Sequence, residues 1–121
     1  MTPVARWERA AMVGARVLVG ALFLAGAVQK AVDPDAVRGL LRGVGLPGAL
    51  VWPALLYDAA AAMALLAGWR LVPVALSLAA YCAFTSIFHF LPDDPWQMTI
   101  FVKNWAIAGG CLALAVAARR V

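Results

Sequence analysis

Charged residues are scarce in this chain. Only 13% of its 121 residues are charged, while 65% are hydrophobic. Ordinary soluble domains carry about 25% charged residues, so a water-soluble fold of this composition would have too little polar surface. We therefore expect an integral membrane protein whose main partner is the lipid bilayer.

Residues that hold metals, haem or redox-active disulfides are nearly absent. There is a single histidine, His89, and there are two cysteines, Cys82 and Cys111, with no CxxC pair and no Cys/His cluster. Counted at about 1.5 Å per residue from the nearest predicted turn, the two thiols lie at different depths, so we expect both to stay free. Nor is there a nucleotide-binding loop or a flavin fingerprint. The sequence thus predicts no metal site, no intrinsic cofactor and no catalytic residue.

Four long apolar runs fill most of the chain. They cover roughly residues 10–29, 49–68, 71–91 and 97–118. About 20 apolar residues cross a bilayer core of about 30 Å as a helix. The runs are apolar on every face, which disfavours a barrel, whose strands alternate polar and apolar residues. The short gaps at 69–70 and 92–96 make neighbouring spans antiparallel. The predicted fold is an all-α membrane protein, an antiparallel four-transmembrane-helix bundle forming one domain over residues 1–121.

The segment between the first two runs predicts a short amphipathic helix over residues 34–43. Asp33-Pro34 is typical of an N-cap followed by proline in the first turn. The apolar residues share one face, with Arg38 and Arg42 away from it, and the helix ends before Gly45-Leu46-Pro47-Gly48. Such a helix lies at the membrane interface. It is either a plain connector or a lid over an outward-facing cavity.

Basic residues gather at the ends of the predicted spans, which explains the net charge of +4 without nucleic acid. One side carries Arg6, Arg9, Arg70, Arg119 and Arg120 with Glu8; the other carries Lys30, Arg38 and Arg42 with Asp33, Asp35, Asp93 and Asp94. Because lysine and arginine accumulate on the cytoplasmic side, we expect both termini to be cytoplasmic. The first run is long for a signal peptide, so we expect it to stay in the membrane.

Three charged residues fall inside the predicted spans, where an isolated charge is costly. Arg16 lies about 9 Å from the cytoplasmic end of its span, Asp58 near mid-membrane, and Lys103 about 9 Å from the outer end. Both long side chains can reach toward Asp58, so these residues are a candidate intramembrane charge network. The alternative for Arg16 is that it snorkels to the headgroups. Asp58 is expected to be paired, protonated or beside a wet cavity.

A second polar group lies toward the outer face. Its members come from three different spans: Gln29, Lys30, His89, Lys103 and Asn104. Together they predict a basic pocket suited to an anionic headgroup, a quinone carbonyl or a small oxyanion. A plain hydrogen-bond network at the interface is the alternative.

Several of these residues occur in an order and spacing known from one family. The carriers are Arg16, Gly20, Phe23, Gly26 and Lys30, the Gly45-Leu46-Pro47 turn, Phe88-His89, Lys103-Asn104 and Gly109-Gly110. Through them the chain resembles, over nearly its full length, the DoxX family of small four-span bacterial membrane proteins. One departure is Asp58, where glutamate is expected in much of the family; the shorter acid keeps the charge but changes its reach.

The resemblance implies a location in the bacterial inner membrane and association with redox proteins there. DoxX-like proteins include subunits associated with a thiosulfate:quinone oxidoreductase, a membrane protein of methylamine utilisation, and partners of redox-protective assemblies. We therefore expect a non-catalytic subunit or scaffold of a larger redox or energy-transducing complex, with a membrane-protein partner or a second copy of the chain beside it. The alternative is a module of a quinone-linked oxidoreductase, with a bound quinone, oxyanion or lipid and with Asp58 relaying protons. A transporter, enclosed only on oligomerisation, is a weaker third hypothesis.

Overall fold

The computed structural model describes residues 3–120, and these residues are predominantly helical. The helices are α1 (Arg6–Val32), α2 (Pro34–Gly43), α3 (Val51–Ala67), α4 (Leu71–Ser86) and α5 (Pro95–Ala118), with single 3-10 turns at Gly48–Leu50 and Ile87–His89. Four helical segments are long and apolar enough to cross a membrane: Arg6–Val32, Gly48–Ala67, Leu71–His89 and Pro95–Ala118. The predicted all-α membrane fold is confirmed.

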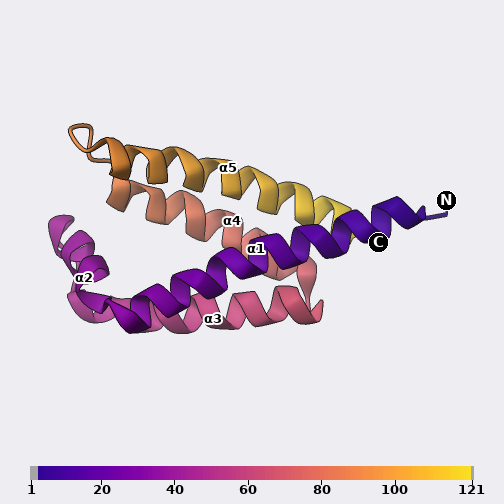
Figure 1. Ribbon diagram of the computed structural model, residues 1–121, viewed down its shortest axis with the longest axis horizontal. Coiled ribbons are helices and arrows are strands. Elements are labelled where there is room, and N and C mark those ends of the chain that lie inside the picture. The colour runs from indigo at the N-terminus through magenta and orange to yellow at the C-terminus, as the bar shows by residue number, and fades with distance from the viewer. Residues whose placement is uncertain (1–2, 121) are drawn as a thin grey trace.

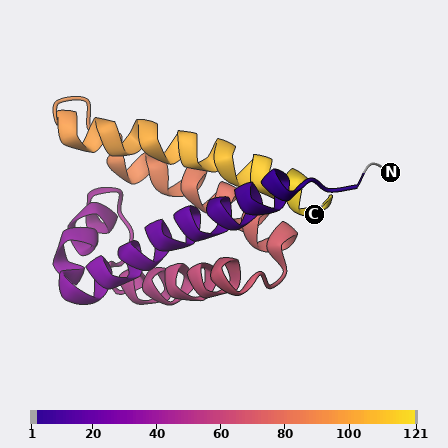
Figure 2. The ribbon, with the colours of Figure 1, turned by 45° about the vertical axis from the view of Figure 1, so that its right-hand side comes forward.

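The four long helices form two tight pairs. Helix α1 packs along α3, and α4 packs along α5, whereas contacts between the two pairs are far fewer (Figure 1). Both termini lie at one end of the bundle, and α2 lies at the other end near the turn between α4 and α5 (Figures 1 and 2). This division leaves room between the pairs for a cavity at the α2 end.

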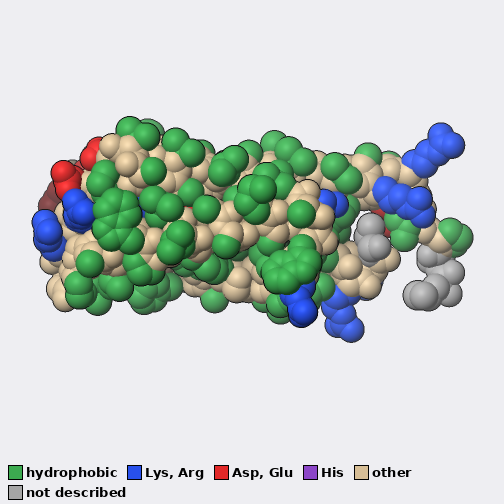
Figure 3. Space-filling model, turned by 90° about the horizontal axis from the view of Figure 1, so that it is seen from below, with side chains coloured by type: hydrophobic (Ala, Val, Ile, Leu, Met, Phe, Trp, Pro, Cys, Tyr) green, Lys and Arg blue, Asp and Glu red, His purple; other side chains and the backbone are tan. Residues whose placement is uncertain are grey.

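Small side chains make the contacts inside the bundle. Ala62, Ala75 and Cys111 are buried beside Leu65 and Leu78 in one core cluster. Small residues allow helix backbones to approach closely, which stabilises bundles in a solvent that supplies little hydrophobic driving force between helices. Large apolar side chains instead cover the outer surface, as Figure 3 shows for one face. That distribution fits a lipid-facing exterior.

The helix ends explain where the boundaries differ from the sequence prediction. Helix α5 begins at Pro95, not near residue 97, because the carboxylate of Asp94 accepts hydrogen bonds from the backbone N–H groups of Trp96 and Gln97 at 3.1 and 3.2 Å. Helix α2 covers the predicted range. Asp33 holds its N-cap position, but its side chain makes no capping hydrogen bond, so Pro34 alone marks the start.

Charged side chains are concentrated at the two ends of the bundle (Figure 3). In that view acidic side chains appear at one end together with basic ones, and basic side chains extend from the opposite end. The middle of the visible face is largely apolar, which leaves the few charges inside the spans as the unusual feature of the fold.

Candidate functional site

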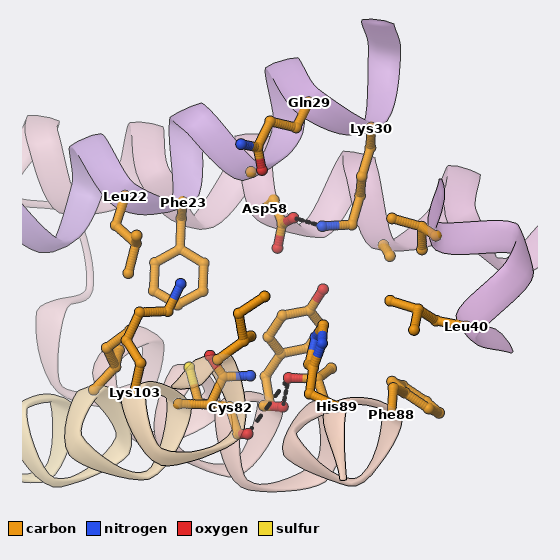
Figure 4. Close-up of a pocket in the computed structure, with 18 of the residues that line it drawn as sticks. Leu22, Phe23, Gln29, Lys30, Leu40, Asp58, Cys82, Phe88, His89 and Lys103 are labelled. Atoms are coloured by element: carbon orange, nitrogen blue, oxygen red, sulfur yellow. Dashed lines mark hydrogen bonds and ion pairs between the residues drawn. The ribbon is translucent and has the colours of Figure 1, made fainter. Parts of the chain in front are cut away.

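A cavity of about 320 Å³ lies between the two helix pairs, near α2. All five helices contribute to its wall (Figure 4). Six of the seven candidate residues from the sequence line it: Gln29, Lys30, Asp58, His89, Lys103 and Asn104. The two groups that the sequence treats separately therefore share one cavity, because α3 brings mid-membrane Asp58 to the same space as the outer polar residues.

An ion pair between α1 and α3 forms one wall. Lys30 Nζ lies 2.6 Å from Asp58 Oδ2, and the side chains are only 16% and 3% exposed. Gly26, one helical turn before Lys30, makes the contact possible: a Cβ there would lie 3.3 Å from Asp58 Oδ2. Asp58 is thus paired, as the sequence allows, but with Lys30 rather than with Arg16 or Lys103.

The second carboxylate oxygen of Asp58 takes no part in the ion pair with Lys30. Oδ1 is buried and accepts no hydrogen bond from the residues that the structure describes. It points away from Lys30, toward the α4 and α5 side of the cavity (Figure 4). A buried carboxylate oxygen is a strong acceptor that is costly to leave unpaired. A donor from a ligand, from water or from the neighbouring Tyr81 hydroxyl would therefore be stabilised at this oxygen.

Arg16 does not join this network. Its Nε and Nη2 groups donate hydrogen bonds to the carbonyl oxygens of Leu65 and Leu66, at 2.9 and 3.0 Å. These carbonyls lie in the last turn of α3, where the helix dipole favours a cation. The last carbonyls of a helix lack partners within it, although that of Leu65 also accepts the N–H of the C-cap residue Gly68 at 3.2 Å. The contact of Arg16 with Asp58 that the sequence suggests is not formed; Arg16 instead caps the end of α3 and so joins α1 to α3.

The α4 and α5 side of the cavity carries a lysine and a histidine. Lys103 and His89 approach from this side and face the Lys30–Asp58 pair across the cavity (Figure 4). Nδ1 of His89 lies 2.6 Å from Oε1 of Gln97; an amide oxygen only accepts, so Nδ1 donates. Lys103 makes no ion pair or hydrogen bond within residues 3–120, and the predicted Lys103–Asp58 contact is not formed.

An aromatic and apolar wall completes the cavity, and the sequence prediction missed it. Tyr81 lines the cavity together with Phe23, and its ring centroid lies 6.3 Å from that of Phe23 and 4.6 Å from that of Tyr57. Leu40 and Leu41 of α2 line the cavity as well. In a chain so rich in apolar residues, the sequence does not distinguish cavity-lining apolar positions from lipid-facing ones. The rotation of each helix about its axis decides which of them face the cavity.

The two cysteines differ in their position relative to the cavity, because Cys82 lines it and Cys111 does not. Both Cys82 and Cys111 are free and buried, as predicted. Within residues 3–120 no group of three histidine, cysteine, aspartate or glutamate side chains is placed to hold a metal ion. The polar groups that line the cavity can form hydrogen bonds and ion pairs with a ligand.

Comparison with models of known protein families gives a match. The family model DoxX matches residues 11–91, about two thirds of the sequence. The chain belongs to the DoxX family. The match runs from α1 through α4 and includes Lys30, Asp58 and His89. No curated protein and no solved structure matches the chain.

The matched DoxX region supplies only part of the cavity. Lys103 and Asn104, which contribute to the sequence resemblance, lie on α5 beyond residue 91. The ion pair, the histidine and the aromatic wall come from the matched region, whereas the unpaired lysine comes from the last helix. In this DoxX-family chain the cavity therefore has an acceptor on the α3 side and donors on the α5 side.

Proposed function

We propose that this DoxX-family chain is a non-catalytic membrane subunit of a redox assembly, and that its cavity binds a quinone or a small oxyanion for that assembly. The observation that supports the binding role is the convergence of six polar residues on one cavity inside an otherwise apolar bundle. Ligand pockets typically combine apolar walls with a few placed polar groups. The DoxX resemblance supports a redox partner.

The chemistry of the wall supports the choice of ligand. The Lys103 ammonium only donates hydrogen bonds and so pairs with a quinone carbonyl or with an anionic oxygen. The rings of Phe23 and Tyr81 offer an apolar surface for a quinone ring. In the same cavity, Asp58 Oδ1, which lies outside the ion pair, accepts a hydrogen bond from a hydroxyl of a quinol or of a protonated oxyanion. Asp58 then holds the ligand by a hydrogen bond.

The subunit role is tested by isolating the tagged chain from native membranes in a mild detergent and measuring the intact particle by mass spectrometry. We expect a fixed stoichiometry with a larger oxidoreductase or electron-transfer assembly. Recovery of the chain alone, or only with copies of itself, would contradict the subunit role and leave the cavity as a site of its own.

The binding role is tested by calorimetric titration of the purified chain in detergent with a short-chain benzoquinone and, separately, with thiosulfate. Lys103→Met should weaken binding of the preferred ligand about tenfold or more, because a hydrogen bond to a charged group contributes about 1.5–3 kcal/mol. Val102→Met is the matched control, since Val102 is 63% exposed on the same helix turn and lies outside the cavity. Equal affinities of the Lys103→Met and Val102→Met variants for the ligand, or no binding of either ligand, would contradict the binding role. A scaffold role would then remain.

A further inference from the structure

Besides the polar cavity near α2, the bundle has a groove at its opposite end, between the start of α1 and the end of α5. Its volume is about 690 Å³, and no residue of the polar cavity lines it. Small residues form much of its wall: Ala11, Ala15, Gly110, Ala113 and Ala117. In Figure 1 the start of α1 lies beside the end of α5 at the end that carries both termini. The groove is therefore a separate feature that the proposed function does not use.

The length of the groove restricts what can occupy it. It extends from Trp7 to Ala15 on α1 and from Gly110 to Arg120 on α5. At 1.5 Å per residue these stretches are about 12 and 15 Å long, or about half of a bilayer core of about 30 Å. A partner's transmembrane helix would run across the whole thickness. A groove one leaflet deep instead matches the acyl chain of a lipid.

The charges at the mouth of the groove select the headgroup. Arg120 lines the groove, and Arg6, Arg9 and Arg119 are exposed in the same terminal turns. The one carboxylate in the wall, that of Glu8, accepts a hydrogen bond from the backbone N–H of Ala5 at 3.1 Å and closes the first turn of α1. Basic pockets between transmembrane helices at the membrane surface attract anionic headgroups.

We propose that this groove binds one anionic phospholipid from the leaflet next to the termini. An acyl chain lies along the small residues between α1 and α5, and the phosphate lies against Arg120 and the neighbouring arginines. Trp7, which is 72% exposed and lines the groove, lies at the headgroup level where indole rings are favoured. The proposal is independent of the ligand in the polar cavity.

The test compares lipid retention by variants of the full chain. Each variant is reconstituted in nanodiscs with equal amounts of phosphatidylglycerol and phosphatidylcholine of the same acyl chains. It is then released into mild detergent and measured by native mass spectrometry. Wild type should retain phosphatidylglycerol over phosphatidylcholine by roughly tenfold, because basic residues near the membrane surface attract an anionic headgroup. The double variant Arg119→Gln/Arg120→Gln should lose most of this preference.

Two adjacent glycines, Gly109 and Gly110, allow a test variant and a matched control variant for binding in the groove. A Cβ at either Gly109 or Gly110 would meet nothing within 4 Å, but only Gly110 lines the groove. Gly110→Leu should therefore abolish retention of phosphatidylglycerol, and Gly109→Leu should not. Ala117→Leu fills the same groove and replaces Gly110→Leu if that variant does not fold, as judged by circular dichroism.

Three results would overturn the proposal. Equal retention of the two lipids by wild type would remove the headgroup selectivity. Equal retention of phosphatidylglycerol by the Gly110→Leu and Gly109→Leu variants would remove the groove as the site. A wild-type dimer that dissociates only in the Gly110→Leu variant would show that a second copy of the chain, and not a lipid, occupies the groove.

Discussion

Removing the Lys30 ammonium should destabilise the protein more than neutralising its partner. The two side chains form a buried pair at 2.6 Å, but they are buried unequally, with 3% of the Asp58 side chain exposed and 16% of the Lys30 side chain. The variants Lys30→Met, Asp58→Asn and the double variant separate the two contributions. Their order, rather than any single value, tests the assignment of the pair.

The burial of Lys30 and of Asp58 determines how much unfolding free energy each variant should lose. Lys30→Met leaves a carboxylate inside the bundle without a counter-ion, which costs about 3–5 kcal/mol of unfolding free energy. Asp58→Asn keeps the shape of the side chain and leaves an ammonium on a flexible stem that can turn toward the headgroups, at a cost of about 1–2 kcal/mol. The double variant contains neither buried charge and should cost about as much as Asp58→Asn alone.

The assay is reversible denaturant unfolding in detergent micelles, followed by circular dichroism. Asp35→Asn is the control, because the Arg38–Asp35 pair is also short, at 2.8 Å, but the Asp35 side chain is 83% exposed. Breaking that pair should cost no more than about 1 kcal/mol. Two results would contradict the stabilising role of the buried pair. One is a loss of unfolding free energy in Lys30→Met that is no larger than in Asp58→Asn. The other is a loss in the double variant that equals the sum of the two single losses.

Two further predictions concern the contact between α1 and the end of α3. Arg16→Met should lower the unfolding free energy by about 2 kcal/mol, because it removes hydrogen bonds from a charged donor to two carbonyls; exposed Arg9→Met should change it by only a few tenths of a kcal/mol. Gly68→Ala should cost about 1–3 kcal/mol, since Gly68 has φ +75° and its Cβ would lie 2.9 Å from Arg16 Nη2. Gly14→Ala, with nothing within 4 Å, is its control. Chemical denaturation checks both, and an Arg16→Met protein as stable as Arg9→Met would contradict the capping role.

The architecture was predictable because the membrane restricts the possible folds so strongly. Backbone groups in lipid must be paired within the chain, so four apolar runs of sufficient length can only become four helices. Pro34 likewise marked the start of α2, because proline fits the first turn of a helix and not its middle. These features depend on residues close together in the chain, and a sequence displays them directly.

The partners of the charged residues were less predictable. Depth along each span favoured Arg16 and Lys103 as partners of Asp58, because both lie inside the predicted spans. The structure pairs Asp58 with Lys30, whose long stem reaches inward past Gly26. Arg16 turns instead to the carbonyls of Leu65 and Leu66. Depth fixes one coordinate of a side chain, whereas pairing also depends on the rotation of each helix about its axis.

The sequence by itself determined the membrane environment, the number of spans and the set of polar residues available for a site, because length, apolar composition and the cost of buried charge are properties of the chain. Only the tertiary structure decided that α1 pairs with α3 and α4 with α5, that six of those polar residues surround one cavity, and that one oxygen of Asp58 lies outside its ion pair there. Apolar runs that look alike on every face carry little information about which face meets which neighbour. Packing of small residues and the pairing of buried charges supply that information.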